Sequence, residues 1–226
     1  MTTLLLIRHG QASLGAADYD VLSPLGVLQA QRLGEHLAAM IDPPDLIVSG
    51  PRRRQQGTAS HLVAAARTLG ADFPDPELRP EFDEYPALEI VQGHLQRLAA
   101  EDPILAAHTQ ALLEHPAGSH THRRAFEHIF QTMMRHWHDE RVLAPDLETN
   151  TEFQARVVRG LQPLLAARGR TILVVTSAGP CGVGVRMGLG LDPWAALQAS
   201  FVVRNSSITE LQSRGGPPYL TMFNAL

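Results

Sequence analysis

Three short runs of apolar residues constrain the fold of this chain more than any other feature. They are TLLLI (Thr3 to Ile7), DLIVS (Asp45 to Ser49) and TILVVT (Thr171 to Thr176). Their apolar character is continuous and does not alternate, which is typical of strands buried on both faces of a parallel sheet. Stretches with helical patterns lie between them. The sequence therefore predicts an α/β fold.

The segment SPLGVLQAQRLGEHLAAM predicts the first helix. Ser23 is a typical N-cap, and Pro24 suits the first helical position. The expected apolar stripe consists of Val27, Ala30, Leu33, Leu37 and Met40. A second helix follows the second apolar run and stops at Gly70. Near the end, SSITELQ and PYLTMF predict a hairpin or two edge strands around Gly215 and Gly216.

Residues 73–150 differ in composition from the rest of the chain. They are richer in His and Pro and include the helical stretch RRAFEHIFQTMMRHWHDE. We expect them to form a helical insertion within one domain that spans residues 1–226. No apolar run approaches the roughly 18 residues of a membrane helix, and the single cysteine, Cys181, allows no intramolecular disulfide. Cytoplasmic residence without membrane association is the default expectation.

Charge and residue usage exclude several functional classes. The net charge of −4 provides no general attraction to nucleic acid. All 19 basic residues are arginine, which excludes a lysine Schiff base and a phosphate-loop lysine. The histidines of HPAGSHTHRR and RHWH lack zinc-site spacing, and no Gly-x-Ser-x-Gly elbow is present. We therefore expect no metal and no cofactor.

Each apolar run ends in a polar motif. The three motifs are Arg8-His9-Gly10, then Ser49-Gly50 followed by Arg52, Arg53 and Arg54, and finally Thr176-Ser177-Ala178-Gly179. In open α/β sheets, ligands bind outside the carboxyl ends of the strands, so these motifs should converge on one crevice. Arginines beside a helix N-terminus favour an anion. A histidine there can act as nucleophile or as general acid and base.

Four motifs resemble those of a known family, the histidine phosphatases (the phosphoglycerate mutase-like superfamily). LLLIRHGQA resembles the family's opening strand and Arg-His-Gly. LSPLGVLQAQRLGEHL is similar to its Leu-Ser/Thr-x-x-Gly turn and following helix. IVSGPRRRQQGTA resembles its second-strand motif, a Ser and then an Arg four residues before Thr-Ala, and NSSITEL resembles its late strand. The four motifs occur in the family's order and cover most of the chain.

The resemblance implies a two-step phosphoryl transfer. His9 would attack the phosphorus and form a phosphohistidine, which water then hydrolyses. Arg8 and one arginine of the trio would clamp the phosphoryl oxygens. The spacing to the Thr-Ala pair selects Arg54, whereas the spacing to Ser49 also permits Arg53.

The family's general acid and base is a carboxylate in the segment after the second helix. Glu84, within Asp83-Glu84-Tyr85, fits this position better, and Glu81 is the alternative. The residues expected to bind the substrate are Gly10, Gln11, Ser177 and Ala178.

The chain departs from the family pattern at the third strand. There the family supplies a second histidine, in a Ser/Thr-His-Gly context, and this sequence has Ser177. A serine hydroxyl can bond a phosphoryl oxygen but brings no positive charge. Losing a charged donor costs roughly 1.5–3 kcal/mol per hydrogen bond, so we expect the reaction to be slower by a factor of roughly 10 to 100.

The resemblance implies a three-layer α/β/α fold with a mostly parallel central sheet and an insertion that caps the active site. The expected activity is that of a metal-independent, acid-type phosphatase on small phosphorylated metabolites. One alternative is phosphoglycerate mutase-type transfer, although a Leu-Asn-Glu-Arg-like segment is missing. The other is a non-catalytic phosphate-binding protein, suggested by Ser177. Substrate identity would reside in residues 73–150, and a homodimer is left open.

Overall fold

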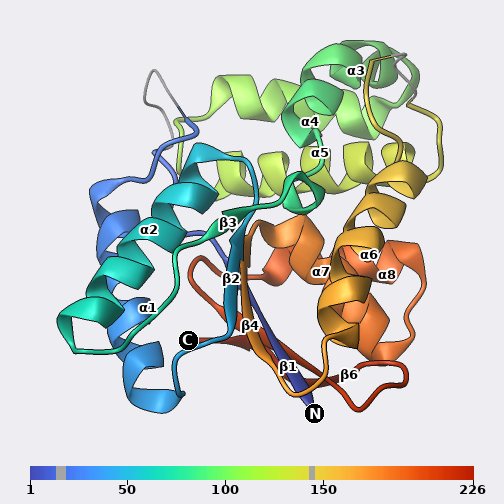
Figure 1. Cartoon of the computed structure of the whole chain (residues 1–226). Helices are drawn as coiled ribbons and strands as arrows, with labels where there is room; N and C mark the ends of the chain where they lie inside the picture. Colours follow the sequence, from blue (N-terminus) through green and yellow to red (C-terminus); the bar gives the residue numbers. More distant parts are fainter. Residues whose placement is uncertain (14–18, 143–145) are drawn as a thin grey trace. The chain divides into compact units, whose positions relative to one another are not determined.

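The three apolar runs form neighbouring parallel strands of one mixed sheet. A computed structural model describes residues 1–13, 19–142 and 146–226, and within these residues the sheet has six strands in the order β3-β2-β4-β1-β5-β6 (Figure 1). The strands are β1 (Thr2–Arg8), β2 (Leu46–Ser49), β3 (Glu77–Leu78), β4 (Thr171–Thr176), β5 (Ile208–Ser213) and β6 (Tyr219–Ala225). The pairs from β3 to β1 are parallel, and β1-β5 and β5-β6 are antiparallel. The mostly parallel sheet and the final hairpin are confirmed.

Burial on both faces explains why the runs are continuously apolar. Leu5 and Ile7 of β1 pack in a cluster with residues of the first two helices, and both are almost completely buried. Leu4 and Leu6 point to the opposite face and are fully buried as well. A strand with solvent on one side would alternate apolar and polar residues. The continuous apolar pattern therefore indicates a sheet that is covered on both faces.

The helices cover both faces of the sheet. Their bounds are α1 (Pro24–Met40), α2 (Arg53–Thr68), α3 (Ala87–Glu101), α4 (Pro103–Glu114), α5 (His120–His138), α6 (Asn150–Ala166), α7 (Ala178–Leu189) and α8 (Pro193–Val202), with a 3-10 turn at Pro80–Phe82. Helices α1 and α2 cover one face, and α7, flanked by α6 and α8, covers the other (Figure 1). This confirms the three-layer α/β/α arrangement. None of the helices in the described residues is long and apolar enough to cross a membrane.

Helix α1 begins where the sequence predicts. The Ser23 hydroxyl accepts a hydrogen bond from the Gly26 backbone N–H at 3.0 Å. Ala30, Leu33 and Leu37 are buried as expected, but the stripe does not reach the helix end. Met40 is 67% exposed, and its neighbours Ala38 and Ile41 pack against the core in its place.

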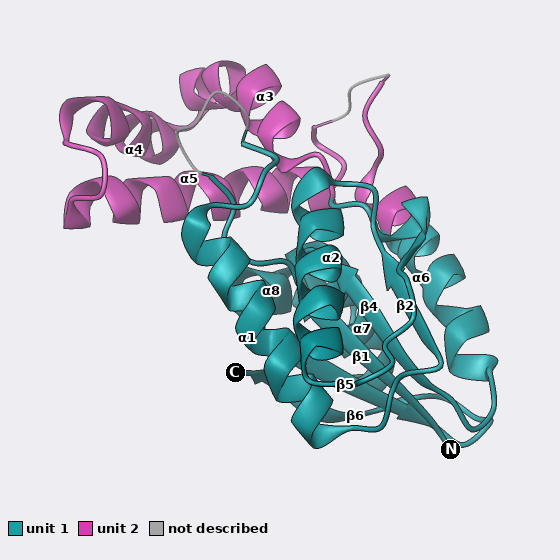
Figure 2. Ribbon diagram, turned by 60° about the vertical axis from the view of Figure 1, so that its left-hand side comes forward, with its two compact units in different colours: residues 1–84, 154–226 teal, residues 85–153 magenta. Residues whose placement is uncertain are grey.

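The chain divides into two compact units (Figure 2). The first comprises residues 1–84 and 154–226 and contains the whole sheet. The second, residues 85–153, contains helices α3, α4 and α5, and its Tyr85 ring stacks on Trp137 with centroids 5.3 Å apart. The expected insertion, 73–150, overlaps the second unit over 85–150. Residues 73–84 belong to the first unit, where Phe73 joins the core.

Helices α1 and α2 pack closely because α1 carries a glycine at their contact. A Cβ on Gly34 would lie 2.2 Å from the backbone carbonyl oxygen of Leu62, so no side chain fits there. By contrast, Gly93 in α3 has no atom within 4 Å of its Cβ position.

Gly34→Ala is expected to lower the free energy of unfolding of the first unit by roughly 1–3 kcal/mol, because the two helices must separate. Gly93→Ala is the matched control and should leave stability unchanged or raise it by up to about 1 kcal/mol. Urea unfolding monitored by circular dichroism measures both. A Gly34→Ala protein as stable as the parent would contradict the close packing.

Candidate functional site

The polar motifs meet at the carboxyl ends of β1, β2 and β4. The His9 backbone N–H donates to the Thr176 carbonyl at 2.8 Å, and the Gly50 N–H donates to the Val175 carbonyl at 3.0 Å. Arg8 and Thr176 are register partners. The strand register alone therefore places the first and third motifs side by side.

Two hydrogen bonds define the tautomer of the His9 imidazole. Its Nδ1 lies 2.7 Å from the Gly10 carbonyl oxygen, which can only accept, so we assign the ring proton to Nδ1. The Arg54 Nε–H donates to Nε2 at 3.1 Å, which requires a lone pair on that nitrogen. Both contacts agree on one tautomer, and Nε2 is the nucleophilic atom of the ring.

The His9 ring is held in its neutral form. The side chain is 4% exposed, and this burial is the main reason why its pKa falls from 6.5 to about 3. The positive charges of Arg54 and Arg8 lower the pKa further, while the hydrogen bond to Gly10 opposes them. At neutral pH the imidazole therefore keeps the lone pair that a nucleophile or base requires.

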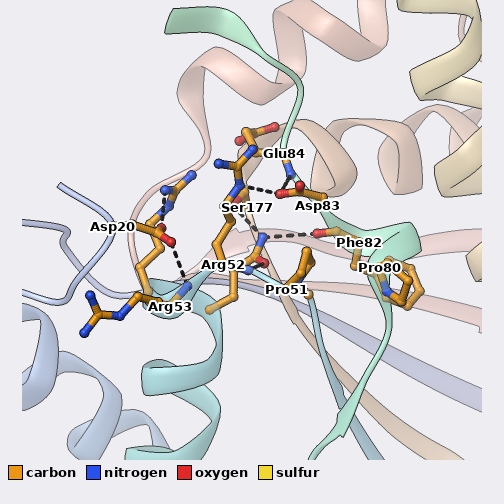
Figure 3. A network of polar contacts seen from close by, with 12 residues as sticks. Asp20, Pro51, Arg52, Arg53, Pro80, Phe82, Asp83, Glu84 and Ser177 are labelled. Atoms are coloured by element: carbon orange, nitrogen blue, oxygen red, sulfur yellow. Dashed lines mark hydrogen bonds and ion pairs between the residues drawn. The ribbon is translucent and has the colours of Figure 1, made fainter. Parts of the chain in front are cut away.

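Arg54, and not Arg53, lies against His9. Arg54 is 8% exposed, and its Nη1 pairs with the Asp20 carboxylate at 2.6 Å, while Arg53 is exposed. Asp20 also accepts the backbone N–H of Arg53 at 2.9 Å (Figure 3), and the Tyr19 ring lies 5.5 Å from the Arg54 guanidinium carbon. Asp20 thus anchors the guanidinium to the first turn of α2.

The Arg8 guanidinium has one N–H group without an acceptor among the described residues. Its Nη1 donates to the Val203 carbonyl, whereas its Nε–H is buried and has no acceptor among the described residues. The Arg8 charge contributes to the lowered pKa of His9 and partly offsets the raised pKa of Cys181. A buried, unpaired N–H beside the histidine suits an anionic ligand.

Cys181 is unsuited to be a nucleophile. Complete burial and the nearby Glu84 carboxylate raise the pKa of its thiol to about 12, and the Arg8 charge offsets this only in part. The group stays a thiol at neutral pH, whereas the thiolate is the reactive form.

The structure places Glu84, and not Glu81, at the end of the sheet strands. Both oxygens of the Glu84 carboxylate accept the Gly179 backbone N–H, at 3.1 and 3.3 Å, at the N-terminus of α7. The Glu81 side chain instead lies against α6, where its Cβ is 2.8 Å from the position of a Cβ on Gly160. Its Oε2 is buried without a hydrogen-bond partner among the described residues.

Ser177 is fully buried directly after β4. Its Oγ accepts a hydrogen bond from the Gln55 side-chain amide at 2.8 Å. The same amide donates to the Phe82 carbonyl at 3.1 Å (Figure 3). A second link crosses this region, where Arg52 Nε pairs with the Asp83 carboxylate at 2.5 Å.

The other expected binding residues have different surroundings. The Gly10 N–H donates to the Thr58 hydroxyl at 3.0 Å, and Ala178 begins α7 and is buried. The Gln11 side chain is exposed and accepts a hydrogen bond from the Ser23 hydroxyl at 2.9 Å, at the start of α1. The structure thus brings Gly10 and Ala178 to the strand ends, and Gln11 contacts the cap of α1.

Three residues near the site were missed in the sequence. Asp20 binds Arg54, Asn205 donates to the His9 carbonyl at 3.0 Å, and Gln55 binds Ser177. Gln55 had a detectable signal, since it falls on the buried stripe of α2 one turn before Ala59. A long polar side chain on such a stripe is unusual unless it has buried partners. Asp20 lies in a connecting segment without a pattern, and Asn205 opens the NSSITEL motif, from which no site residue was predicted.

The described residues contain no group of three or more His, Cys, Asp or Glu side chains that could hold a metal ion. The assembled groups are a neutral imidazole, two guanidinium groups, a carboxylate and the N-terminus of α7. Together they can bind a tetrahedral anion, attack it and exchange a proton with it.

Comparisons with known proteins bear on the family and on the fold as a whole. The model of the histidine phosphatase superfamily (branch 1) matches residues 4–111 and 95–226. The fold is similar to that of a phosphoserine phosphatase from Entamoeba histolytica, with 19% identity, a TM-score of 0.63 and coverage of 100% of this chain and 98% of that one. No curated protein sequence matches the chain.

Two further solved structures share the fold. One is a phosphoglycerate mutase from Bacillus anthracis, with 17% identity and a TM-score of 0.64, covering 99% of this chain and 93% of that one. The other is a mycobacterial glucosyl-3-phosphoglycerate phosphatase, with 20% identity and a TM-score of 0.59, covering 99% and 98% of the two chains.

The depressed pKa of His9 predicts its titration. Ring ¹⁵N shifts, assigned with a His9→Gln variant, should show a neutral imidazole at about pH 5, where a free histidine is mostly protonated, and protonation only near pH 3. Because the unfolded chain binds this proton at 6.5 and the native state does not, His9 should destabilise the native state as pH falls from 6.5 toward 3. Arg54→Met should raise the pKa by removing a positive charge. A midpoint near 6.5 would refute the assignment.

Proposed function

The chain belongs to the histidine phosphatase superfamily, and we propose that it is a phosphomonoester hydrolase that acts on small phosphorylated metabolites through a phosphohistidine at His9. The observation that carries this proposal is the pair of hydrogen bonds that leaves a lone pair on His9 Nε2 beside Arg54. The phosphatases among the structural neighbours act on phosphoserine and on a glucosyl phosphoglycerate, which supports a phosphorylated metabolite as substrate.

In the first step, His9 Nε2 attacks the phosphorus. The N–P bond forms while the P–O bond to the leaving group breaks, and the leaving oxygen takes a proton from Glu84. Arg54 exchanges its hydrogen bond with Nε2 for one with a phosphoryl oxygen, and the unpaired Arg8 Nε–H binds another. These donors are in place before reaction, so the developing charge meets an organised site.

In the second step, water attacks the phosphohistidine. The Glu84 carboxylate takes a proton from the water as the new O–P bond forms and the N–P bond breaks. Phosphate leaves, and His9 and Glu84 return to their starting protonation states. No step uses a metal ion. The position of Glu84 beside Gly179 supports this role, since a carboxylate near an anion site serves proton transfer better than anion binding.

Hydrolysis of p-nitrophenyl phosphate in the presence of EDTA tests the proposal. We expect turnover that EDTA does not reduce and that falls by at least about a thousandfold in His9→Ala, because both steps pass through the Nε2–P bond. Acid-quenched protein should carry acid-labile phosphate on His9. Absence of turnover, with orthophosphate binding retained, would instead support the non-catalytic phosphate-binding alternative.

Glu84→Gln and Glu81→Gln form a matched pair that tests the proton donor. Glu84→Gln should lower kcat by roughly 10²–10⁴ for an alkyl phosphate such as phosphoserine, whose leaving oxygen needs a proton. The loss should be smaller for p-nitrophenyl phosphate, because p-nitrophenolate leaves without one. Glu81→Gln should retain activity on both substrates. Equal losses in the two variants would reject Glu84 as the specific acid.

A further inference from the structure

Gln55 is a fully buried polar side chain in the first turn of α2. It connects three parts of the site. Its Oε1 accepts the Arg52 backbone N–H at 2.9 Å, and its Nε2 lies 3.1 Å from the Phe82 carbonyl oxygen and 2.8 Å from Ser177 Oγ. Burying an amide costs free energy that an apolar side chain of similar size would not cost. The presence of Gln55 at this position therefore suggests a role beyond filling space.

The orientation of the Gln55 amide has one solution. The Phe82 carbonyl oxygen can only accept, so the side-chain nitrogen must face it. The Arg52 N–H can only donate, so the side-chain oxygen must face that group. A flipped amide would lose both bonds. The hydrogen that reaches Ser177 therefore comes from Gln55 Nε2, and Ser177 Oγ is the acceptor.

This leaves the hydroxyl proton of Ser177 available. Among the described residues no acceptor receives it, and although Ser177 is the N-cap of α7, its side chain makes no capping bond. Ser177 directly follows Thr176, whose carbonyl accepts the His9 N–H. The uncommitted proton therefore belongs to a residue at the same strand ends as the nucleophile, shielded from water like His9.

We propose that Gln55 is a positioning residue that holds the Ser177 hydroxyl as a hydrogen-bond donor to a phosphoryl oxygen of the substrate. The inference rests on the proposed function and deepens it. A hydroxyl can donate or accept, and against a phosphoryl oxygen only donation is useful. Because the Gln55 N–H takes one lone pair of Ser177 Oγ, the hydroxyl proton must point away from Gln55 and is free to donate when the substrate binds.

The same geometry makes Ser177 and Gln55 a unit. An imidazole at position 177 is larger than a hydroxymethyl group, and it would need the space that the Gln55 amide fills at 2.8 Å from Ser177 Oγ. Gln55 thus excludes a larger donor and orients the smaller one. The Ser177 hydroxyl, a neutral and oriented donor, thus takes the place of the cationic imidazole that the resemblance implies at this position.

Reversing the polarity at position 55 tests the proposal. In Gln55→Glu, the introduced carboxylate accepts the Ser177 proton and withdraws it from the phosphoryl group. We would measure kcat and KM for p-nitrophenyl phosphate with Ser177→Ala, Gln55→Glu and the double variant. Gln56→Glu is the matched control, because Gln56 is exposed on the same turn and its side-chain amide donates to the Pro51 carbonyl.

We expect Ser177→Ala and Gln55→Glu each to lower kcat/KM by about tenfold or more, the worth of one neutral hydrogen bond. In the Ser177→Ala background, Gln55→Glu should cost markedly less. Lowering the pH protonates the introduced carboxylate, whose single O–H can then donate to Ser177 Oγ, although it cannot also donate to the Phe82 carbonyl. The recovery of kcat/KM should therefore be larger when Ser177 is present than in the Ser177→Ala background. Gln56→Glu should retain parental activity.

Two results would overturn the inference while leaving the proposed function intact. One is an active parent with an equally active Ser177→Ala. The other is a loss from Gln55→Glu that is the same with and without Ser177, which would make Gln55 a purely structural link to Phe82. Circular dichroism verifies folding of each variant, and Gln55→Met replaces Gln55→Glu if the latter does not fold, with the same dependence on Ser177 expected.

If the parent hydrolyses no phosphomonoester, the proposed function fails and the inference is judged by binding alone. Calorimetry with inorganic phosphate then decides. A Kd that rises by about tenfold in Ser177→Ala would support the donor role of Ser177. An unchanged Kd would reject it.

Discussion

The hydrogen bond from the His9 N–H to the Thr176 carbonyl is the contact on which the rest of the site depends. It continues the parallel register of β1 and β4 by one residue beyond Arg8. That register is maintained by side chains on both faces of β1, because Leu6 fits against Gly184 of α7 on one face and Leu5 packs in the cluster formed with α1 and α2 on the other. The hydrophobic core thereby fixes the backbone of the nucleophile beside Thr176, the residue before Ser177.

The turn after His9 is equally constrained, by the absence of side chains. A Cβ on Gly10 would lie 2.5 Å from the Gly26 carbonyl oxygen, and a Cβ on Gly26 would lie 2.1 Å from that of Gln11. The chain therefore passes directly against the first turn of α1. This contact holds the Gly10 carbonyl, which in turn sets the tautomer of His9. Two glycines distant in sequence thus contribute to the chemistry of the imidazole.

Local rules predicted what depends on local sequence. The strands followed from continuous apolar runs. Arg54 was selected through the resemblance, by its spacing to Thr58, and the structure places both on one face of α2, where the Thr58 hydroxyl bonds the Arg54 carbonyl. Met40 was misassigned because periodicity does not distinguish positions three and four residues after Leu37, and Ile41, not Met40, packs against the core. The contacts of Asp20 with Arg54 and of Gln55 with Ser177 could not be read from local patterns, since they join segments far apart in the chain and depend on how the strands are ordered.

The site carries less free positive charge than its arginines suggest. Arg54 is paired with Asp20, and the residue after β4 is a neutral serine where the resemblance implies a second histidine. In our proposal, an incoming phosphoryl group meets the Arg54 Nε–H that now bonds His9, the unpaired Arg8 Nε–H and the hydroxyl that Gln55 orients. A neutral donor such as the Ser177 hydroxyl does not attract an anion from a distance as a charged group does. It therefore contributes most when it is aligned before the anion binds. A buried amide whose orientation two backbone groups dictate provides such alignment, so a polar side chain in the core of α2 is consistent with a site that relies on order more than on charge.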